Sequence, residues 1–368
     1  MTTLNIASSI ASSISIDPRA ARAMLYRNGA EAIRRICAVP EDISVTDWAA
    51  RERILPETSS SPGAYDPSIV PYARRWQDLG ADPSISRIAL CWATQTTKST
   101  VIENIIAYRI VHMPSPMVIV QPKIDAAEGW AKERFVPMVR ATPALKFRVR
   151  LGRSSGSTMR YMAFPGGFVF VASAQSATEI ASRSSPFVSS DEVDRMEIIP
   201  GEGNPVEIVD QRQGASDIGL HVMTSTPRSE DTTIIWPYLE SGSYELYHVR
   251  CPHCGQSQPL FWCNLHWEPG QPMGAYYVCG GAGTPGSGRE PSPVLEQYLQ
   301  SPIAHKTESG VLAGCGATID ERAKPQMLTG GEWRATNPNA DYPSSHLHGL
   351  YSPFAKSSWG ALARKFEK

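Results

Sequence analysis

The segment from Arg87 to Thr100 constrains the fold of this chain more than any other stretch. The apolar run Arg87-Ile-Ala-Leu-Cys-Trp92 leads into a polar turn, and the turn ends in Lys98-Ser99 at the head of a helical pattern. A strand followed by a loop and a helix N-terminus can bind nucleotide phosphates, because backbone N–H groups and the helix dipole converge on the anion. We predict that Lys98 contacts the β- and γ-phosphates and that the Ser99 hydroxyl holds Mg²⁺. The predicted nucleotide-binding residues are Gln95, Thr96, Thr97, Lys98, Ser99 and Thr100.

This phosphate loop departs from the pattern G-x-x-x-x-G-K-[ST], because Trp92 and Thr97 occupy the two glycine positions. An ordinary polar loop between a strand and a helix is therefore an alternative interpretation. Just before the first strand, Tyr72 or Trp76 could stack on an adenine ring.

A second segment favours the nucleotide site. Residues 187–191 read as a short strand that ends in Asp191-Glu192. In P-loop ATPases an Asp at this place binds Mg²⁺ and the adjacent Glu orients the attacking water. The alternative is a charged helix cap, and Ser189 and Ser190 stand where apolar residues are usual.

A third apolar segment, residues 218–223, is followed by the hydroxyl-rich stretch Thr224-Ser225-Thr226. Hydroxyl groups at the end of such a strand can sense the γ-phosphate and couple it to movement. We therefore predict a coupling role for Ser225 and Thr226, with a plain exit from strand to loop as the alternative.

Residues 131–160 form a basic segment with eight Lys or Arg residues and one acidic residue, Glu133, which gives a local net charge of +7. The alternation in Lys146-Phe-Arg-Val-Arg150-Leu predicts a strand with the basic residues on one face and the apolar residues on the other. The predicted DNA-binding residues are Lys146, Arg148 and Arg150. A solvated edge strand is the alternative, because lysine and arginine also discourage aggregation at sheet edges.

Five of the seven cysteines follow residue 250, and three of these precede a glycine. The spacing C-x2-C-x24-C-x35-C supplies four thiolates, the ligand set that tetrahedral zinc prefers. The predicted zinc ligands are Cys251, Cys254, Cys279 and Cys315, with Gly280–Gly314 as an insertion within the second knuckle. Possible substitute ligands are Cys263, His253, His266 and His305. Buried free thiols are the alternative, and Cys37 and Cys91 are expected in the core.

Taken together, these segments resemble the large subunit of the lambda-type phage terminase family over roughly residues 44–366. The resemblance rests on Val45-Thr-Asp-Trp-Ala49, Pro71-Tyr72, Gln95-x-x-Lys98-Ser99, Val120-Gln-Pro122, Ser189-Ser-Asp-Glu-Val-Asp194, Ser225-Thr-Pro-Arg228, Cys251-Pro-His-Cys-Gly255 and Leu350-Tyr-Ser-Pro-Phe354. It implies an α/β P-loop ATPase of the additional-strand, catalytic-glutamate type, with a mostly parallel sheet flanked by helices and a small β-rich, zinc-ribbon-like insertion.

The resemblance also implies a function. The chain would be an ATP-driven motor subunit that moves double-stranded DNA into a procapsid in the host cytoplasm, with ATP, Mg²⁺ and Zn²⁺ as cofactors. The catalytic residues would be Lys98, Asp191 and Glu192. Partners would be duplex DNA, the terminase small subunit, the portal and further copies of the chain in a ring. Candidates for an arginine that acts in the neighbouring subunit are Arg140, Arg183 and Arg228.

The alternative from another class is a DNA-binding or assembly module with a degenerate ATP site. The family's nuclease domain is not expected here, because only 14 residues follow Phe354, so cleavage of DNA by this chain is not predicted. Neither a membrane span nor a signal peptide is predicted, since no apolar run approaches 18 residues and the serine-rich N-terminus lacks a basic region.

Alternating apolar runs and helical patterns predict four parts of the chain. These are residues 1–43 as a serine-rich tail and a helix from Asp17 to about Cys37, 44–245 as the ATPase core, 246–325 as the zinc-ribbon-like part and 326–368 as a return segment. Predicted core elements are strands at 88–92, 117–120, 159–163 and 167–172, and helices at 99–111 and 125–139.

Overall fold

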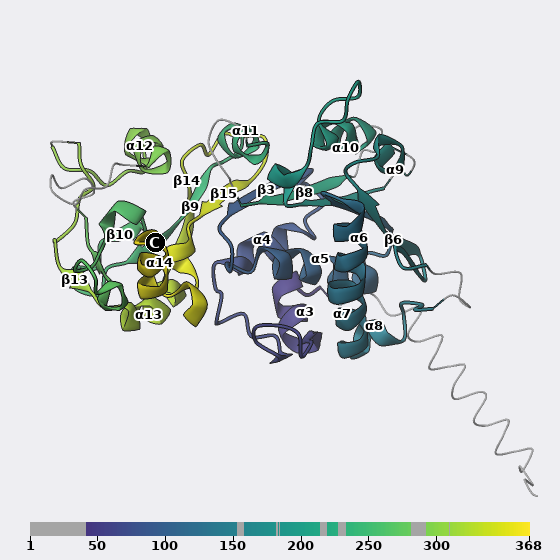
Figure 1. Ribbon diagram of the computed structural model, residues 1–368, viewed down its shortest axis with the longest axis horizontal. Helices are drawn as coiled ribbons and strands as arrows, with labels where there is room; N and C mark the ends of the chain where they lie inside the picture. The colour runs from purple at the N-terminus through teal and green to yellow at the C-terminus, as the bar shows by residue number, and fades with distance from the viewer. Residues whose placement is uncertain are drawn as a thin grey trace, which may run out of the picture. The chain divides into compact units, whose positions relative to one another are not determined.

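A sheet of ten strands runs through the described part of the chain (Figure 1). The computed structural model describes residues 42–152, 158–181, 183, 185–213, 219–226, 233–280, 292–308 and 310–368. The chain divides into residues 1–43 and 44–368, and all elements named below belong to the second unit. The predicted helix from Asp17 to Cys37 lies outside the described residues.

The order of strands along the sheet is β10-β9-β15-β3-β8-β7-β4-β6-β5, and β14 pairs with β9 as well. The bounds are β3 Arg87–Trp92, β4 Pro116–Gln121, β5 Tyr161–Phe164, β6 Gly167–Ser173, β7 Phe187–Asp191, β8 Leu220–Ser225, β9 Glu245–Arg250, β10 Ser257–Pro259, β14 Glu332–Ala335 and β15 Ser344–Leu347. The seven strands from β9 to β6 are all parallel, whereas β5, β10 and β14 pair antiparallel. The predicted mostly parallel α/β fold is confirmed.

Helices cover both faces of this sheet, as right-handed crossovers between parallel strands require. On one face lie α3 Val45–Glu52, α4 Ala73–Leu79, α5 Lys98–His112, α6 Ile124–Trp130, the π-helix Ala131–Phe135, α7 Val136–Ala141 and α8 Pro143–Lys146 (Figure 1). On the other lie α9 Ala177–Ala181, α10 Pro205–Gln213 and α11 Ile235–Ser241. The four central strands are buried along almost their whole length, and α5 is buried because α3 and α4 pack against it.

The last third of the chain forms a smaller β-rich part beside β9 and then returns to the sheet. Its elements are β11 Leu265–His266, β12 Tyr276–Val278, β13 Thr318–Ile319, α12 Pro293–Gln300, α13 Lys324–Thr329 and α14 Trp359–Phe366. Short 3-10 helices are Val193–Arg195, Trp262–Asn264, Pro272–Gly274, Glu321–Ala323, Gly349–Tyr351 and Ala355–Ser357, and β1 Ile54–Leu55 pairs with β2 Gly63–Ala64. The predicted return segment supplies β15, which lies between β9 and β3 in the main sheet.

One predicted strand is wrong. Residues 146–150 end α8 and form a turn, because Pro143 starts a short helix and the N–H groups of Arg148 and Val149 both donate to the carbonyl of Leu145. The strict two-face alternation is lost as well, since Phe147 is 88% exposed rather than buried.

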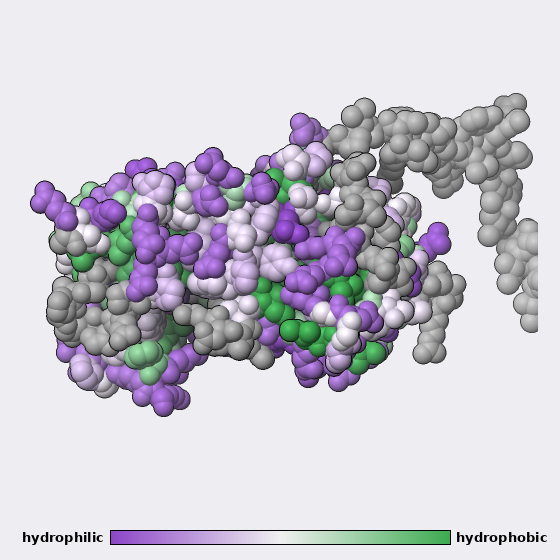
Figure 2. Space-filling model, turned by 90° about the horizontal axis from the view of Figure 1, so that it is seen from above, coloured by the Kyte–Doolittle hydropathy of each residue, from purple (hydrophilic) through white to green (hydrophobic). Residues whose placement is uncertain are grey.

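The surface seen from the α9–α11 side is mostly hydrophilic, with smaller apolar patches between the charged groups (Figure 2). Among the described residues, no helix has the length and apolar character needed to cross a membrane.

Candidate nucleotide site and cysteine cluster

The phosphate loop, residues 93–97, connects the buried strand β3 to the N-terminus of α5. Two of its residues have left-handed backbones, Gln95 at φ 62° and Thr97 at φ 67°. The Thr96 hydroxyl donates to the carbonyl of Ala93 at 2.6 Å, which closes the loop on itself. Thr97 stands at the second glycine position of the usual pattern, and its positive φ explains why glycine is favoured there. The substitution therefore keeps the loop's shape at a conformational cost.

Lys98 brings the three predicted segments together. Its side chain is buried, and its ammonium nitrogen lies 3.0 Å from Oε1 of Glu192 and donates to the Thr226 hydroxyl. Thr226 in turn donates to the carbonyl of Trp92 at 3.1 Å. These groups meet because β3, β7 and β8 are parallel neighbours, so their carboxyl ends lie at one edge of the sheet.

Asp191 ends β7 and is buried, and its carboxylate accepts a hydrogen bond from Thr224 of β8 at 2.5 Å. Burial raises the pKa of Asp191, and the charge of Glu192 acts in the same direction, whereas Thr224 and Lys98 oppose the shift. Glu192 itself has a left-handed backbone at φ 55°, and its Oε2 lies 3.5 Å from Nε of Arg195. A buried carboxylate that is costly to ionise gains most from a cation beside it.

Ser225 has a different environment from Thr226. Its hydroxyl accepts a hydrogen bond from the backbone N–H of Asp194 at 3.1 Å, and Asp194 accepts from Ile234 and Ile235 at the start of α11. Ser225 therefore fixes the turn that follows Glu192. Ser99 and Thr100 lie half-buried in the first turn of α5.

The sequence signal for one network was present but was read only as a departure from an apolar pattern. Ser190 lies 2.9 Å from Nε2 of His221, whose Nδ1 lies 2.8 Å from Asp210 of α10. Asp210 also accepts from Arg87 at 2.6 Å. Burial opposes the ionisation of Asp210, but His221 and Arg87 outweigh it and lower the pKa of this carboxyl. Ser190 and His221 are fully buried, so this Ser-His-Asp arrangement fixes β7 to β8 and α10 and offers no access to a substrate.

The expected adenine contact is wrong for this structure. Tyr72 and Trp76 are fully buried, and both rings pack edge-on against Trp92 at centroid distances of 5.8 Å and 6.4 Å. Neither ring presents a face to a base. The two aromatic residues instead support the strand that carries the phosphate loop.

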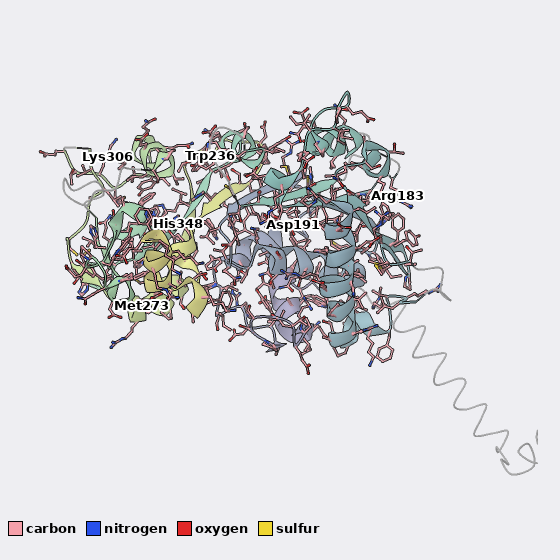
Figure 3. The ribbon with its side chains drawn as sticks, viewed as in Figure 1. Arg183, Asp191, Trp236, Met273, Lys306 and His348 are labelled. Atoms are coloured by element: carbon pink, nitrogen blue, oxygen red, sulfur yellow. The ribbon has the colours of Figure 1, made fainter. Side chains whose placement is uncertain are left out.

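The candidate arginines differ in their surroundings. Arg140 is exposed on α7. Arg183 lies beside α9, on the β6 side of the sheet from Asp191 (Figure 3), and its guanidinium packs over Phe170 at 4.3 Å from the ring centre. Arg228 lies outside the described residues. Lys146, Arg148 and Arg150 are exposed together in the turn after α8.

The four predicted zinc ligands form one cluster, in which all ligand atoms lie within 4.8 Å of one another. The sulfur atoms of Cys251 and Cys315 are 3.9 Å apart, and those of Cys254 and Cys279 are 3.8 Å apart. Tetrahedral zinc with Zn–S bonds of about 2.3 Å places its sulfur ligands about 3.8 Å apart. A backbone hydrogen bond from Gln256 lowers the pKa of Cys254 to about 7, which favours the thiolate that binds metal. The cluster fits zinc.

The ends of the predicted insertion meet at this cluster. Gly280, at φ 71°, packs so closely on Gly314 that an added Cβ would lie 2.4 Å from its Cα. This contact brings Cys279 beside Cys315 although 35 residues separate them in the sequence. Among the substitute ligands, the ring of His253 is 3.1 Å from the carbonyl of Thr318, and Cys263 bonds to Asn264.

Comparison with known proteins decides the family. A family model described as "Phage terminase large subunit gpA, ATPase domain" matches residues 59–296. The chain belongs to this family. It is 25% identical over 312 residues to the terminase large subunit of Enterobacteria phage P21, covering 82% of this chain and 48% of that protein. It is 25% identical over 253 residues to the terminase large subunit of Escherichia phage lambda, covering 65% and 39%. The chain thus spans about half the length, or less, of these curated relatives.

Solved structures of large terminases are more distant. The HK97 bacteriophage large terminase aligns with a TM-score of 0.44 at 17% identity, covering 55% of this chain and 41% of that one. The ATPase domain of the Thermus phage P74-26 large terminase aligns with a TM-score of 0.39 at 15% identity, covering 79% and 86%. The resemblance predicted from the sequence is confirmed by the family match.

Proposed function

We propose that this chain binds Mg·ATP in the loop 93–98 and hydrolyses it to drive double-stranded DNA into a phage procapsid. The observation that carries the proposal is the meeting of Lys98, Glu192 and Thr226 at one sheet edge. The position of β8 between β3 and β7 supports the additional-strand, catalytic-glutamate class.

Each side chain has a distinct part in the reaction. Lys98 neutralises charge on the β- and γ-phosphates, and its contact with phosphate replaces the ion pair with Glu192. Glu192, thereby released, orients the attacking water and accepts its proton. Ser99 and Asp191 hold Mg²⁺, which neutralises the charge that develops on the phosphate oxygens.

Thr226 links these groups to movement. Its hydroxyl contacts Lys98 and the carbonyl of Trp92, so a change at the γ-phosphate reaches both β8 and the start of the phosphate loop. Ser225 holds the turn after Glu192 in the same register. Gln95, Thr96, Thr97 and Thr100 complete the phosphate contacts.

The motor acts in the host cytoplasm as a ring of copies with duplex DNA, the small subunit and the portal as partners. Arg140 and Arg183 remain candidates for the arginine that reaches into a neighbouring copy's site. Lys146, Arg148 and Arg150 contact phosphates of the duplex. Because the turn that carries them is exposed, it can approach DNA without base specificity.

The cysteine cluster binds one structural zinc ion. With four protein ligands the site is closed, so zinc stabilises the fold around β10–β13 and takes no part in hydrolysis. The spacing of the sulfur atoms supports this assignment.

The rival function is a non-hydrolysing assembly module, which the left-handed, non-glycine residues of the phosphate loop favour. Steady-state ATPase assays with and without duplex DNA separate the two functions. The motor predicts activity that needs Mg²⁺ and exceeds that of the Lys98→Ala variant. Activity equal to the Lys98→Ala background would support the module.

A further inference from the structure

The segment Leu350-Tyr-Ser-Pro-Phe354 is one of the motifs of the sequence, yet the proposed ATP chemistry does not use it. It follows β15 and lies beside the phosphate loop: the Ser352 hydroxyl donates to the carbonyl of Gln95 at 2.7 Å. Ser352 is completely buried, so water does not compete for this bond. The contact joins two parts of the chain that are 257 residues apart in sequence.

The bond falls where the loop needs support. Gln95 has φ 62°, a conformation that side chains other than glycine avoid. Such a conformation persists only where surrounding contacts hold it. Among printed contacts of Gln95, the hydroxyl of Ser352 is the one that comes from outside the loop and its strand.

The neighbouring residue reaches in the opposite direction. The Tyr351 hydroxyl donates to the carbonyl of Tyr247 in β9 and accepts from the N–H of Leu260, just after β10. The β9–β10 hairpin carries Cys251 and Cys254 in its connecting turn. Tyr351 therefore ties together both strands on which half of the cysteine cluster is mounted.

We propose that Tyr351 and Ser352 form a strap, in which Ser352 is a positioning residue for the phosphate loop and Tyr351 couples that loop to the cysteine cluster. The strap replaces the backbone freedom that glycine supplies in the usual loop. Loss of metal from the cluster loosens the hairpin, releases Tyr351 and weakens nucleotide binding. The inference rests on the proposed nucleotide site.

The test measures the affinity of a fluorescent ATP analogue with Mg²⁺ in the full chain. Ser352→Ala should raise Kd about five- to tenfold, whereas Ser352→Thr, which keeps the hydroxyl, should stay near the wild-type value. Ser185→Ala is the matched control, because Ser185 is buried and donates to the carbonyl of Pro116 at the same 2.7 Å but lies at the opposite end of the strands. Its Kd should not change.

Tyr351→Phe tests the coupling while keeping the ring. Removal of zinc by a chelator should raise the nucleotide Kd of the wild-type chain severalfold, and should have little further effect in Tyr351→Phe. Unchanged Kd in Ser352→Ala, or equal chelator effects in wild type and Tyr351→Phe, would overturn the strap while leaving the nucleotide site intact. Wild-type affinity as poor as that of Lys98→Ala would overturn the nucleotide site, and the strap with it.

Discussion

Replacement of Glu192 by glutamine changes the proposed reaction at a single atom pair. Glutamine keeps the shape of the side chain but cannot accept a proton from water or pair with the ammonium of Lys98, 3.0 Å away. We expect turnover to fall about 10²-fold or more, which corresponds to about 2.7 kcal/mol of activation free energy. Ligation of Mg²⁺ by Asp191 should persist.

Binding of ATP should survive the same change. Glu192 is 24% exposed, so its ion pair with Lys98 is worth about 1 kcal/mol at most. Since phosphate must displace that pair, affinity should rise by no more than about fivefold. Single-turnover hydrolysis and equilibrium binding measure the two effects separately.

The control is Glu197→Gln. Glu197 is 73% exposed, and its partner Lys123 is 3.7 Å away, so this variant removes the same charge without touching the site. It should hydrolyse ATP as the wild type does. Normal hydrolysis by Glu192→Gln would refute the assignment of the Asp-Glu pair.

Three further predictions follow from the structure. Purified protein should hold about one zinc ion per chain; Cys254→Ser should reduce it and lower Tm, Cys263→Ser should leave metal content unchanged, and metal analysis without zinc would contradict the cluster's role. Changing all three exposed basic residues of the turn after α8 to Gln should weaken duplex binding on every sequence and flatten the log-affinity against log-salt slope by about 0.9 per lost contact; an unchanged slope with normal affinity would leave them as a solvated turn. Asp191→Asn should raise Tm at pH 7 by a few degrees while abolishing hydrolysis. Because burial raises the folded-state pKa of Asp191, its charged form costs stability above that pKa, so the gain in Tm should shrink as pH falls toward 4, and a pH-independent gain would argue against this cause.

The nucleotide site could be predicted because its parts are local. Each of the segments that end in Trp92, Asp191 and Ser225 is an apolar run followed at once by polar residues. Parallel strands place such ends at one edge, so sequence order alone brings Lys98 near Glu192. The cysteine cluster was predictable for a different reason, because zinc chemistry restricts its ligands to a few residue types.

The remaining features depend on which elements become neighbours. Nothing near Ser190 in the sequence indicates His221 or Asp210, whose positions follow from the register of β7 with β8 and from the packing of α10. The burial of Tyr72 against Trp92 likewise depends on how α4 packs on the sheet.

The basic turn shows a limit of pattern reading. Alternation over five residues predicted a strand, but Pro143 starts a helical turn whose own hydrogen bonds satisfy the backbone. Short alternating runs do not decide between the two outcomes when a helix start lies three residues upstream.

The central claim is that the loop 93–98 and the Asp-Glu turn form one Mg·ATP site. Its most direct test is an experimental structure of the chain with Mg²⁺ and a non-hydrolysable ATP analogue. We expect the γ-phosphate beside Lys98, the metal between Ser99 and Asp191, and Glu192 released from Lys98. Phosphates bound elsewhere, or a Lys98–Glu192 pair that stays closed with nucleotide present, would contradict the account.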